Sequence, residues 1–131
     1  MFLVEFKSVP LEFQRKTEQE DFSLKWELSY NICEFLKNGF YFAHFFIQLF
    51  HSNNGNVATG FLMAFSDECD RSLPLNNAYA TRASFTMDNS SVTFYLANIL
   101  TSDAGYFTLT LSYDFSSSEQ QNTSALFVYG W

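Results

Sequence analysis

Apolar and polar residues alternate without interruption through residues 21–30, DFSLKWELSY. One row comprises Phe22, Leu24, Trp26, Leu28 and Tyr30; the other comprises Asp21, Ser23, Lys25, Glu27 and Ser29. A period of two residues predicts a β-strand with one face buried. The pattern therefore places Trp26 at the centre of a buried row.

Similar strand-length segments recur along the chain, separated by polar turns. The predicted strands are 2–7, 10–16, 21–30, 40–50, 58–65, 80–87, 91–98, 105–115 and 125–130. The predicted breaks are 51–56, 66–77, 88–91 and 116–124. The Asn-Asn-Gly turn after 40–50 indicates a hairpin. Nine short strands with no convincing helix predict an all-β sandwich or barrel.

The length and composition predict one folded domain with a sizeable core. The chain has 131 residues, of which 47% are hydrophobic and 20% aromatic, and these values exclude a disordered chain. No segment approaches the roughly 20 apolar residues of a membrane-spanning helix. The first ten residues lack the features of a secretory signal. We expect residues 1–131 to be a single module from a longer protein.

The acidic balance narrows the classes of partner. The formal net charge is −7, whereas binding to nucleic acid or to an anionic membrane needs clustered Lys and Arg. We therefore expect no nucleic acid partner and no direct membrane contact by this domain. The simplest role of the negative charge is solubility.

No residue constellation predicts catalysis or a cofactor. Neither His44 nor His51 has an identifiable nucleophile and carboxylate around it, and no Gly-rich phosphate loop is present. His51 is predicted to lie in a turn. Acidic residues gather at 18–21 and 67–70, where solvated turns are favoured over a calcium site. We expect no enzyme activity, no metal and no cofactor.

The segment 82–107, RASFTMDNSSVTFYLANILTSDAGYF, carries the most specific pattern. It resembles the D-E-F region of an immunoglobulin variable-type (V-set) domain: an Arg opens a strand, a hairpin and an alternating strand follow, and Asp-x-Gly precedes an aromatic residue. The resemblance implies a V-set-like Greek-key sandwich. It also implies a structural salt bridge between Arg82 and Asp103, which are 21 residues apart; a bidentate pair suits that role.

The sequence departs from the V-set pattern at its inter-sheet disulfide. Leu109 occupies the position of the second cysteine, and Trp26 occupies that of the first. The alternation fixes this register, since it buries Phe107, Leu109 and Leu111. We expect Trp26 and Leu109 to face each other in the core in place of the disulfide. Phe107 replaces the corner tyrosine of the family, and Phe45 is the candidate for its strand-C tryptophan.

The two cysteines, Cys33 and Cys69, match no cysteine position of the family. In V-set geometry their loops lie at the same end, so a disulfide is sterically feasible and would contribute roughly 4 kcal/mol; two free thiols are the alternative. Asn89-Ser-Ser and Asn122-Thr-Ser are glycosylation sequons in predicted turns. Both features fit an extracellular protein.

The strand at 40–50 is apolar on both faces. If Phe45 and Ile47 face the core, the opposite row comprises Phe42, His44, Phe46, Gln48 and Phe50. An outer face should be polar unless a partner covers it. In V-set proteins this strand belongs to the G-F-C-C′ sheet, which commonly pairs. We expect a protein-binding face there; the alternative is that strand twist and the 66–79 connection bury the row.

These features predict the extracellular ectodomain of a cell-surface membrane protein, acting as a recognition or adhesion receptor. Membrane-distal domains without the usual cysteines and tryptophan resemble cnidarian allorecognition receptors, which implies homophilic binding between like copies. The alternatives are a heterophilic receptor, a viral immunomodulatory ectodomain, or a β-barrel carrying an apolar ligand. Exposed aromatic residues would also suit glycan binding.

Overall fold

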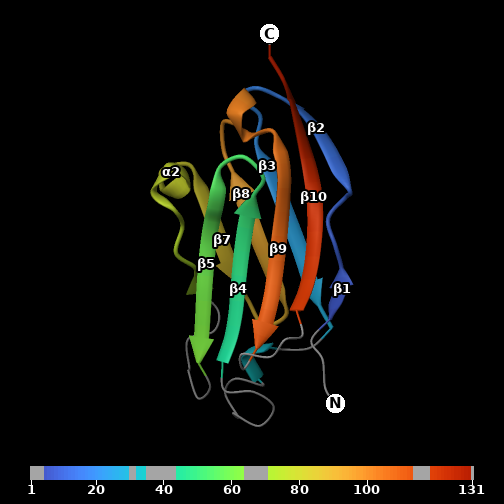
Figure 1. Ribbon diagram of the computed structural model, residues 1–131, viewed down its shortest axis with the longest axis vertical. Helices are drawn as coiled ribbons and strands as arrows, with labels where there is room; N and C mark the ends of the chain where they lie inside the picture. The colour runs from blue at the N-terminus through green and yellow to red at the C-terminus, as the bar shows by residue number, and fades with distance from the viewer. Residues whose placement is uncertain (1–4, 30–31, 35–43, 64–70, 114–118, 131) are drawn as a thin grey trace.

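Two five-stranded sheets pack face to face in the computed structural model (Figure 1). The structure describes residues 5–29, 32–34, 44–63, 71–113 and 119–130. The front sheet has the order β2-β10-β9-β4-β5, and the back sheet has the order β1-β3-β8-β7-β6. The chain is therefore a sandwich of two separate sheets, which contradicts the alternative of a closed barrel.

The strands agree with the predicted alternation in most segments. They are β1 (Phe6–Ser8), β2 (Phe13–Thr17), β3 (Phe22–Leu28), β4 (His44–His51), β5 (Gly55–Met63), β6 (Arg71–Ser72), β7 (Ala83–Met87), β8 (Ser91–Leu96), β9 (Gly105–Tyr113) and β10 (Glu119–Tyr129). The short helices α2 (Asn77–Ala80) and η1 (Thr101–Asp103) lie between strands. The prediction missed β6, α2 and η1.

Among the strand pairs that the structure describes, all are antiparallel except that of β2 with β10. β2 pairs in parallel with β10, from Phe13 beside Ala125 to Thr17 beside Tyr129. β1, in contrast, pairs with β3 in the back sheet. The N-terminal segment thus contributes one strand to each sheet and bridges the side of the sandwich.

Inward rows from both sheets fill the core. β3 buries every second residue, and Trp26 at its centre has no exposed surface. Phe107 of β9 packs against Phe22 and Phe94, with ring centroids 5.5 Å apart in both pairs. Such tilted aromatic contacts add to the free energy of apolar burial.

One break was predicted wrongly in a way that affects the site. Residues 116–124 were expected to be a turn, but β10 begins at Glu119. β10 pairs with β9 from Glu119 beside Ser112 to Leu126 beside Gly105. Asn122 therefore lies in a strand and not in a turn.

Candidate protein-binding face

The outward row of β4 is the one that the alternation predicted. Phe45, Ile47 and Leu49 are wholly buried. The outward positions are His44, Phe46, Gln48 and Phe50, and their side chains are at least partly exposed. Phe50 is 48% exposed. Phe42 was also predicted to belong to this row, and it lies outside the described residues.

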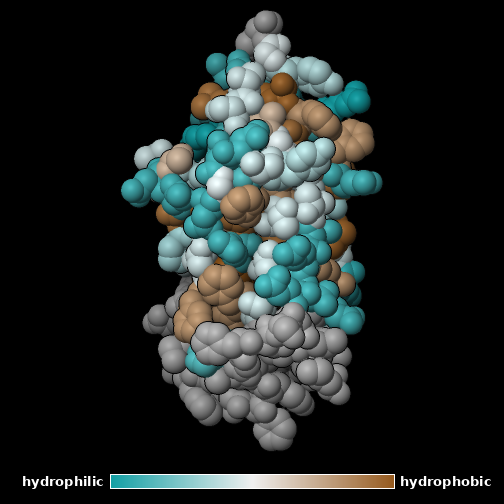
Figure 2. Space-filling view, in the orientation of Figure 1, coloured by the Kyte–Doolittle hydropathy of each residue, from teal (hydrophilic) through white to brown (hydrophobic). Residues whose placement is uncertain are grey.

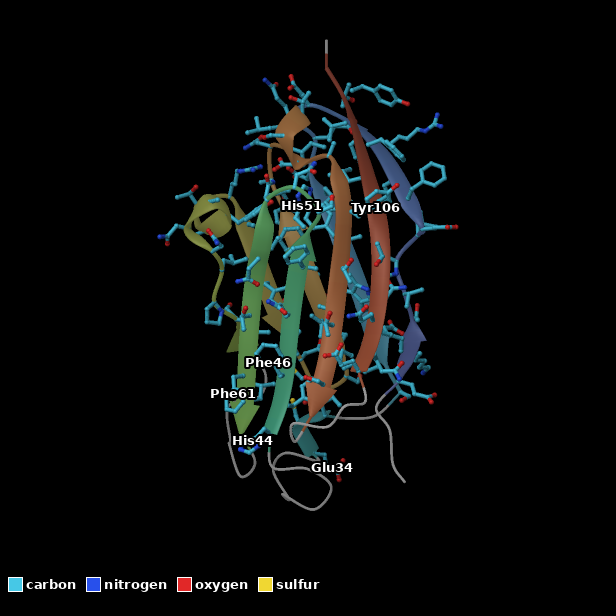
Figure 3. All side chains as sticks on the ribbon, viewed as in Figure 1. Glu34, His44, Phe46, His51, Phe61 and Tyr106 are labelled. Carbon is cyan, nitrogen blue, oxygen red and sulfur yellow. The ribbon has the colours of Figure 1, made fainter. Side chains whose placement is uncertain are left out.

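Neighbouring strands extend this row into a continuous surface. This surface, the outward side of the sheet β2-β10-β9-β4-β5, is called here the front face. Phe46 lies beside Phe61 of β5 and beside Ser112 of β9. Phe61 is 46% exposed, and its ring stacks on that of His44 with centroids 5.4 Å apart. Figure 3 shows His44, Phe46 and Phe61 together near one end of β4 and β5. The described part of the 66–79 connection therefore leaves Phe50 and Phe61 exposed.

A second aromatic group occupies the other side of the front face. Phe13 of β2 and Phe127 of β10 meet edge to face, with ring centroids 5.8 Å apart. Tyr129 and Tyr106 are also exposed, by 52% and 57%. The front face thus presents aromatic rings across the whole width of the sheet. Aromatic side chains of this kind are enriched at protein–protein interfaces.

The front face carries almost no charge. The strands β4, β5 and β9 contain no Asp, Glu, Lys or Arg, although 16% of the chain is charged. Among the outward strand positions of the front sheet that the structure describes, only Arg15 of β2 and Glu119 of β10 are charged. Figure 2 shows brown apolar patches among white and teal polar side chains on this side of the molecule. Depletion of charge is a compositional mark of interface centres.

The outward side of the back sheet is mostly polar. Its outward positions include Lys25, Glu27, Ser84 and Thr86. Only one strand residue of this sheet, Tyr95, belongs to the ten exposed large hydrophobic residues described, whereas six lie on strands of the front sheet. The hydroxyl of Tyr95 donates to Asp21 at 2.6 Å, and this hydrogen bond lowers the pKa of Asp21.

Part of the β5 edge is already paired within the chain. The Thr59 N–H donates to the Pro74 carbonyl, the Asn76 N–H donates to the Val57 carbonyl, and Ala58 forms a bridge with Leu75. An exposed strand edge invites pairing with another chain. Because this stretch is closed, contact with a partner at β5 would involve side chains of the front face.

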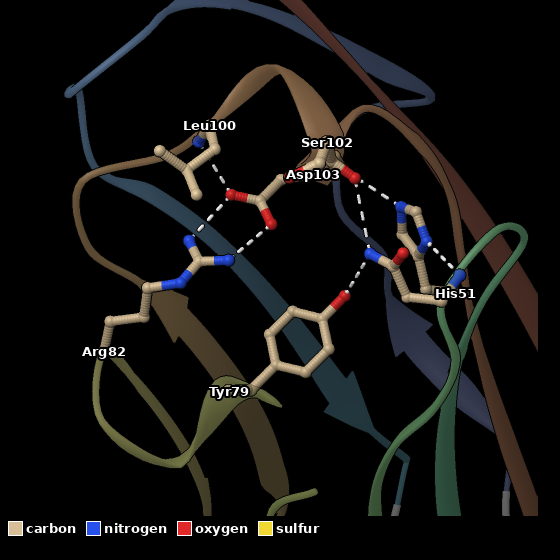
Figure 4. A network of polar contacts seen from close by, with 7 residues as sticks. His51, Tyr79, Arg82, Leu100, Ser102 and Asp103 are labelled. Carbon is tan, nitrogen blue, oxygen red and sulfur yellow. Dashed lines mark hydrogen bonds and ion pairs between the residues drawn. The ribbon is translucent and has the colours of Figure 1, made fainter. Parts of the chain in front are cut away.

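The corner between β7 and β9 holds the predicted ion pair (Figure 4). The Arg82 guanidinium donates to both carboxylate oxygens of Asp103, at 2.7 and 2.6 Å. The Leu100 N–H donates to the same carboxylate at 2.8 Å. The side chain of Asp103 is 1% exposed, and its hydrogen bond to Arg82 is the main cause of the raised pKa of the guanidinium.

Next to this ion pair, His51 joins the β4–β5 turn to the start of β9. It was predicted to lie in a turn, but it ends β4 as a wholly buried inward residue. Its Nδ1 accepts from the N–H groups of Asn53 and Asn54 at 3.2 and 3.1 Å. Nε2 must therefore carry the proton and donate to the Asp103 carbonyl at 2.9 Å. The role of His51 is structural.

Trp26 links the two sheets by a contact that the sequence did not reveal. Its indole N–H donates to the Asn122 side-chain oxygen at 2.9 Å. Trp26 belongs to the back sheet and Asn122 to the front sheet, where Asn122 lies beside the wholly buried Leu109. Trp26 thus reaches across the sandwich at the level of Leu109. A hydrogen bond and a large buried ring thus join the two sheets at this level.

The two sequons lie in different environments. Asn89 is exposed in the turn between β7 and β8, as predicted. The side chain of Asn122 alternates with outward Gln121 and Thr123 and is engaged by Trp26. Only Asn89 therefore projects as an acceptor for a glycan.

The structure describes one of the two cysteines. Cys33 is disulfide-bonded, while Cys69 lies outside the described residues, so the Cys33–Cys69 pairing stays a prediction. The described residues contain no group of three His, Cys, Asp or Glu side chains that could hold a metal ion. Within the same residues, no helix is long and apolar enough to cross a membrane.

Comparison with known proteins identifies the fold and not a family. No protein-family model and no curated protein sequence matches the chain. Solved structures do match. The titin domains Z1Z2 in complex with telethonin give a TM-score of 0.61 at 11% identity, covering 98% of this chain and 48% of that chain.

Two further matches cover both chains almost completely. The titin M10–obscurin-like 1 Ig complex gives a TM-score of 0.59 at 14% identity, with 97% of this chain and 94% of that chain covered. A chain from a structure on T cell specificity and activation by toxic shock syndrome toxin-1 gives 0.60 at 10% identity, with 97% and 98% covered. The chain therefore has an immunoglobulin-like β-sandwich fold.

Proposed function

We propose that this chain is a V-set-like recognition domain of an extracellular cell-surface protein, and that its front face binds a second copy of itself. The observation that carries the proposal is the uncharged aromatic surface of β4, β5 and β9. The outer face of a sandwich is ordinarily polar, as the back sheet is here. An aromatic outer face on one sheet alone indicates that a partner covers it.

The absence of charged residues from β4, β5 and β9 allows a second copy to be that partner. Each copy carries a net charge of −7, so two copies repel one another over most of their surfaces. On the central strands of the front face this repulsion has no local source, because those strands carry no carboxylate. Exposed rings such as Phe50 and Phe61 supply the apolar contact that a self-complementary interface needs.

The first experiment is bead aggregation with the domain displayed on beads of two colours. Wild-type beads are expected to form clumps, whereas beads carrying Phe50→Arg are expected to stay dispersed. Phe50 is half exposed, so arginine there leaves folding intact while placing an unpaired charge in the contact. The expected loss of affinity is about 30-fold, the effect of removing an interface hot spot of about 2 kcal/mol.

The matched control is Thr86→Arg, which adds the same charge at an exposed position of the back sheet. Beads with this change should clump like wild type. Failure of folded wild-type beads to clump would overturn self-binding and direct the search to a different protein partner. Equal loss in both variants would show that net charge, and not the front face, controls adhesion.

Secretion predicts a glycan at one sequon only. When the chain is expressed through the secretory pathway of animal cells, Asn89 is expected to be glycosylated and Asn122 unmodified, because Trp26 holds the Asn122 side chain. Mass spectrometry of peptides with and without glycosidase treatment measures the occupancy of each site. Glycan at Asn122 in folded protein would contradict the placement of its side chain.

A further inference from the structure

Among the residues that the structure describes, two charged residues occupy outward strand positions of the front face, and they have opposite signs and lie toward opposite ends of it. Arg15 of β2 lies beside Phe127 of β10 in the parallel register. Glu119 is the first residue of the same strand, β10. Eight residues of β10 separate these two levels, which corresponds to about 27 Å along the strand. Both side chains are exposed.

Such a pair distinguishes the two simple ways of packing the front face on its own copy. If a twofold axis lies in the plane of contact and runs perpendicular to the strands, the two copies are antiparallel. The end of one front face that holds Arg15 then meets the end of the other that holds Glu119. Arg15 of each copy then lies over Glu119 of its mate, and both charges are paired. The Arg15 side chain is long enough to cross from β2 to the neighbouring β10 position. This arrangement makes two symmetric ion pairs at the rim of the contact.

A twofold axis along the strands gives the opposite outcome. Glu119 would then meet the part of the other front face that holds His44, Phe46 and Phe61. Arg15 would meet the N-terminal end of β5, which carries no charge. Each charged side chain would then be partly desolvated without a permanently charged partner of opposite sign. Unpaired burial of a charge costs more free energy than a paired contact, so the first arrangement is favoured.

We propose that two copies pair front face to front face in antiparallel orientation, with Arg15 of each copy against Glu119 of the other. Along β10, the midpoint between the two charges is Thr123. Thr123 lies beside Thr108 of β9, and Thr108 lies beside Phe50 of β4. The twofold axis therefore passes over this row and brings Phe50 close to its own counterpart. The inference rests on the proposed homophilic function and adds the orientation and the specificity-determining charges.

Charge reversal provides a test that restores binding only in the antiparallel arrangement. Arg15→Glu places two glutamates opposite each other at both rims, and Glu119→Arg places two arginines there. Each variant alone is expected to self-associate at least about tenfold more weakly than wild type, since facing like charges are strongly unfavourable. An equimolar mixture of the two is expected to form a heterodimer of wild-type affinity, because both rims then pair opposite charges.

The measurement is sedimentation velocity of each purified variant and of the mixture, with one species fluorescently labelled. Lys25→Glu is the matched control: it makes the same charge change at an exposed position of the back sheet and should leave the dissociation constant unchanged. Circular dichroism melts establish that every variant is folded. The double variant, with both charges exchanged, should self-associate like wild type.

The outcomes separate the orientation from the function beneath it. If wild type is monomeric at every concentration, homophilic binding and this inference both fall. If wild type associates and Phe50→Arg abolishes association, but the charge-reversed mixture stays monomeric, the function stands and the antiparallel orientation is overturned. Heterodimer formation by the mixture alone supports the orientation.

Discussion

Arg82→Met is expected to lower the free energy of unfolding by about 3–5 kcal/mol, because it leaves the buried Asp103 carboxylate without its counter-ion. The side chain of Asp103 is 1% exposed and would keep only the hydrogen bond from the Leu100 N–H. Urea denaturation followed by tryptophan fluorescence measures the change.

The double variant Arg82→Met/Asp103→Leu separates the cost of an unpaired charge from the worth of the pair. Removing both charges should cost less than the sum of the two single changes, since neither residue then leaves an orphaned partner. Additive losses would show that the ion pair does not couple the β7 and β9 corners. Thr86→Met, an exposed change in β7, the strand that follows Arg82, should stay within about 0.5 kcal/mol of wild type.

Trp26→Ala is expected to destabilise the domain by about 3–5 kcal/mol, the range for removing a large aromatic side chain from a core. Trp26 is wholly buried and donates to Asn122 across the sandwich. Trp26→Phe keeps an aromatic ring and loses the donor, so its cost should be smaller.

A double-mutant cycle of Trp26→Phe with Asn122→Ala isolates the hydrogen bond. We expect a coupling energy of about 1 kcal/mol, typical of one buried hydrogen bond. Urea denaturation followed by circular dichroism gives all four stabilities without depending on Trp26 fluorescence. A coupling near zero would mean that Trp26 acts only through packing.

Much of the front face could be predicted because its signal is local. Alternation in β4 separates Phe45 and Ile47 from Phe46 and Gln48, and a one-residue shift would bury the wrong row. The interval between Arg82 and Asp103 predicted their ion pair in the same way. In each case the spacing along one segment, together with a known fold plan, was sufficient.

The inter-sheet contact and the buried histidine depend on longer-range relations. The first six residues of β10, 119–124, are all polar, on the outward side as well as on the inward side, where Asn122 lies. Hydrophobic periodicity cannot detect such a strand. His51 sits against a turn sequence, yet extending the buried row from Ile47 and Leu49 by two residues would have found it. Its carbonyl partner, on Asp103, lies 52 residues away.

The parallel pairing of β2 with β10 determines how the domain carries mechanical load. In this pair the N-terminal end of β2 and the C-terminal end of β10 lie at opposite ends of the shared ladder, as Figure 1 also shows. A force that separates the chain ends slides these strands past each other. The hydrogen bonds between the two parallel strands then bear the force together and must break together. Peeling one strand from the other would instead break them one at a time. The strand that holds Phe13 and Arg15 in the front face would thus also resist tension transmitted through the chain.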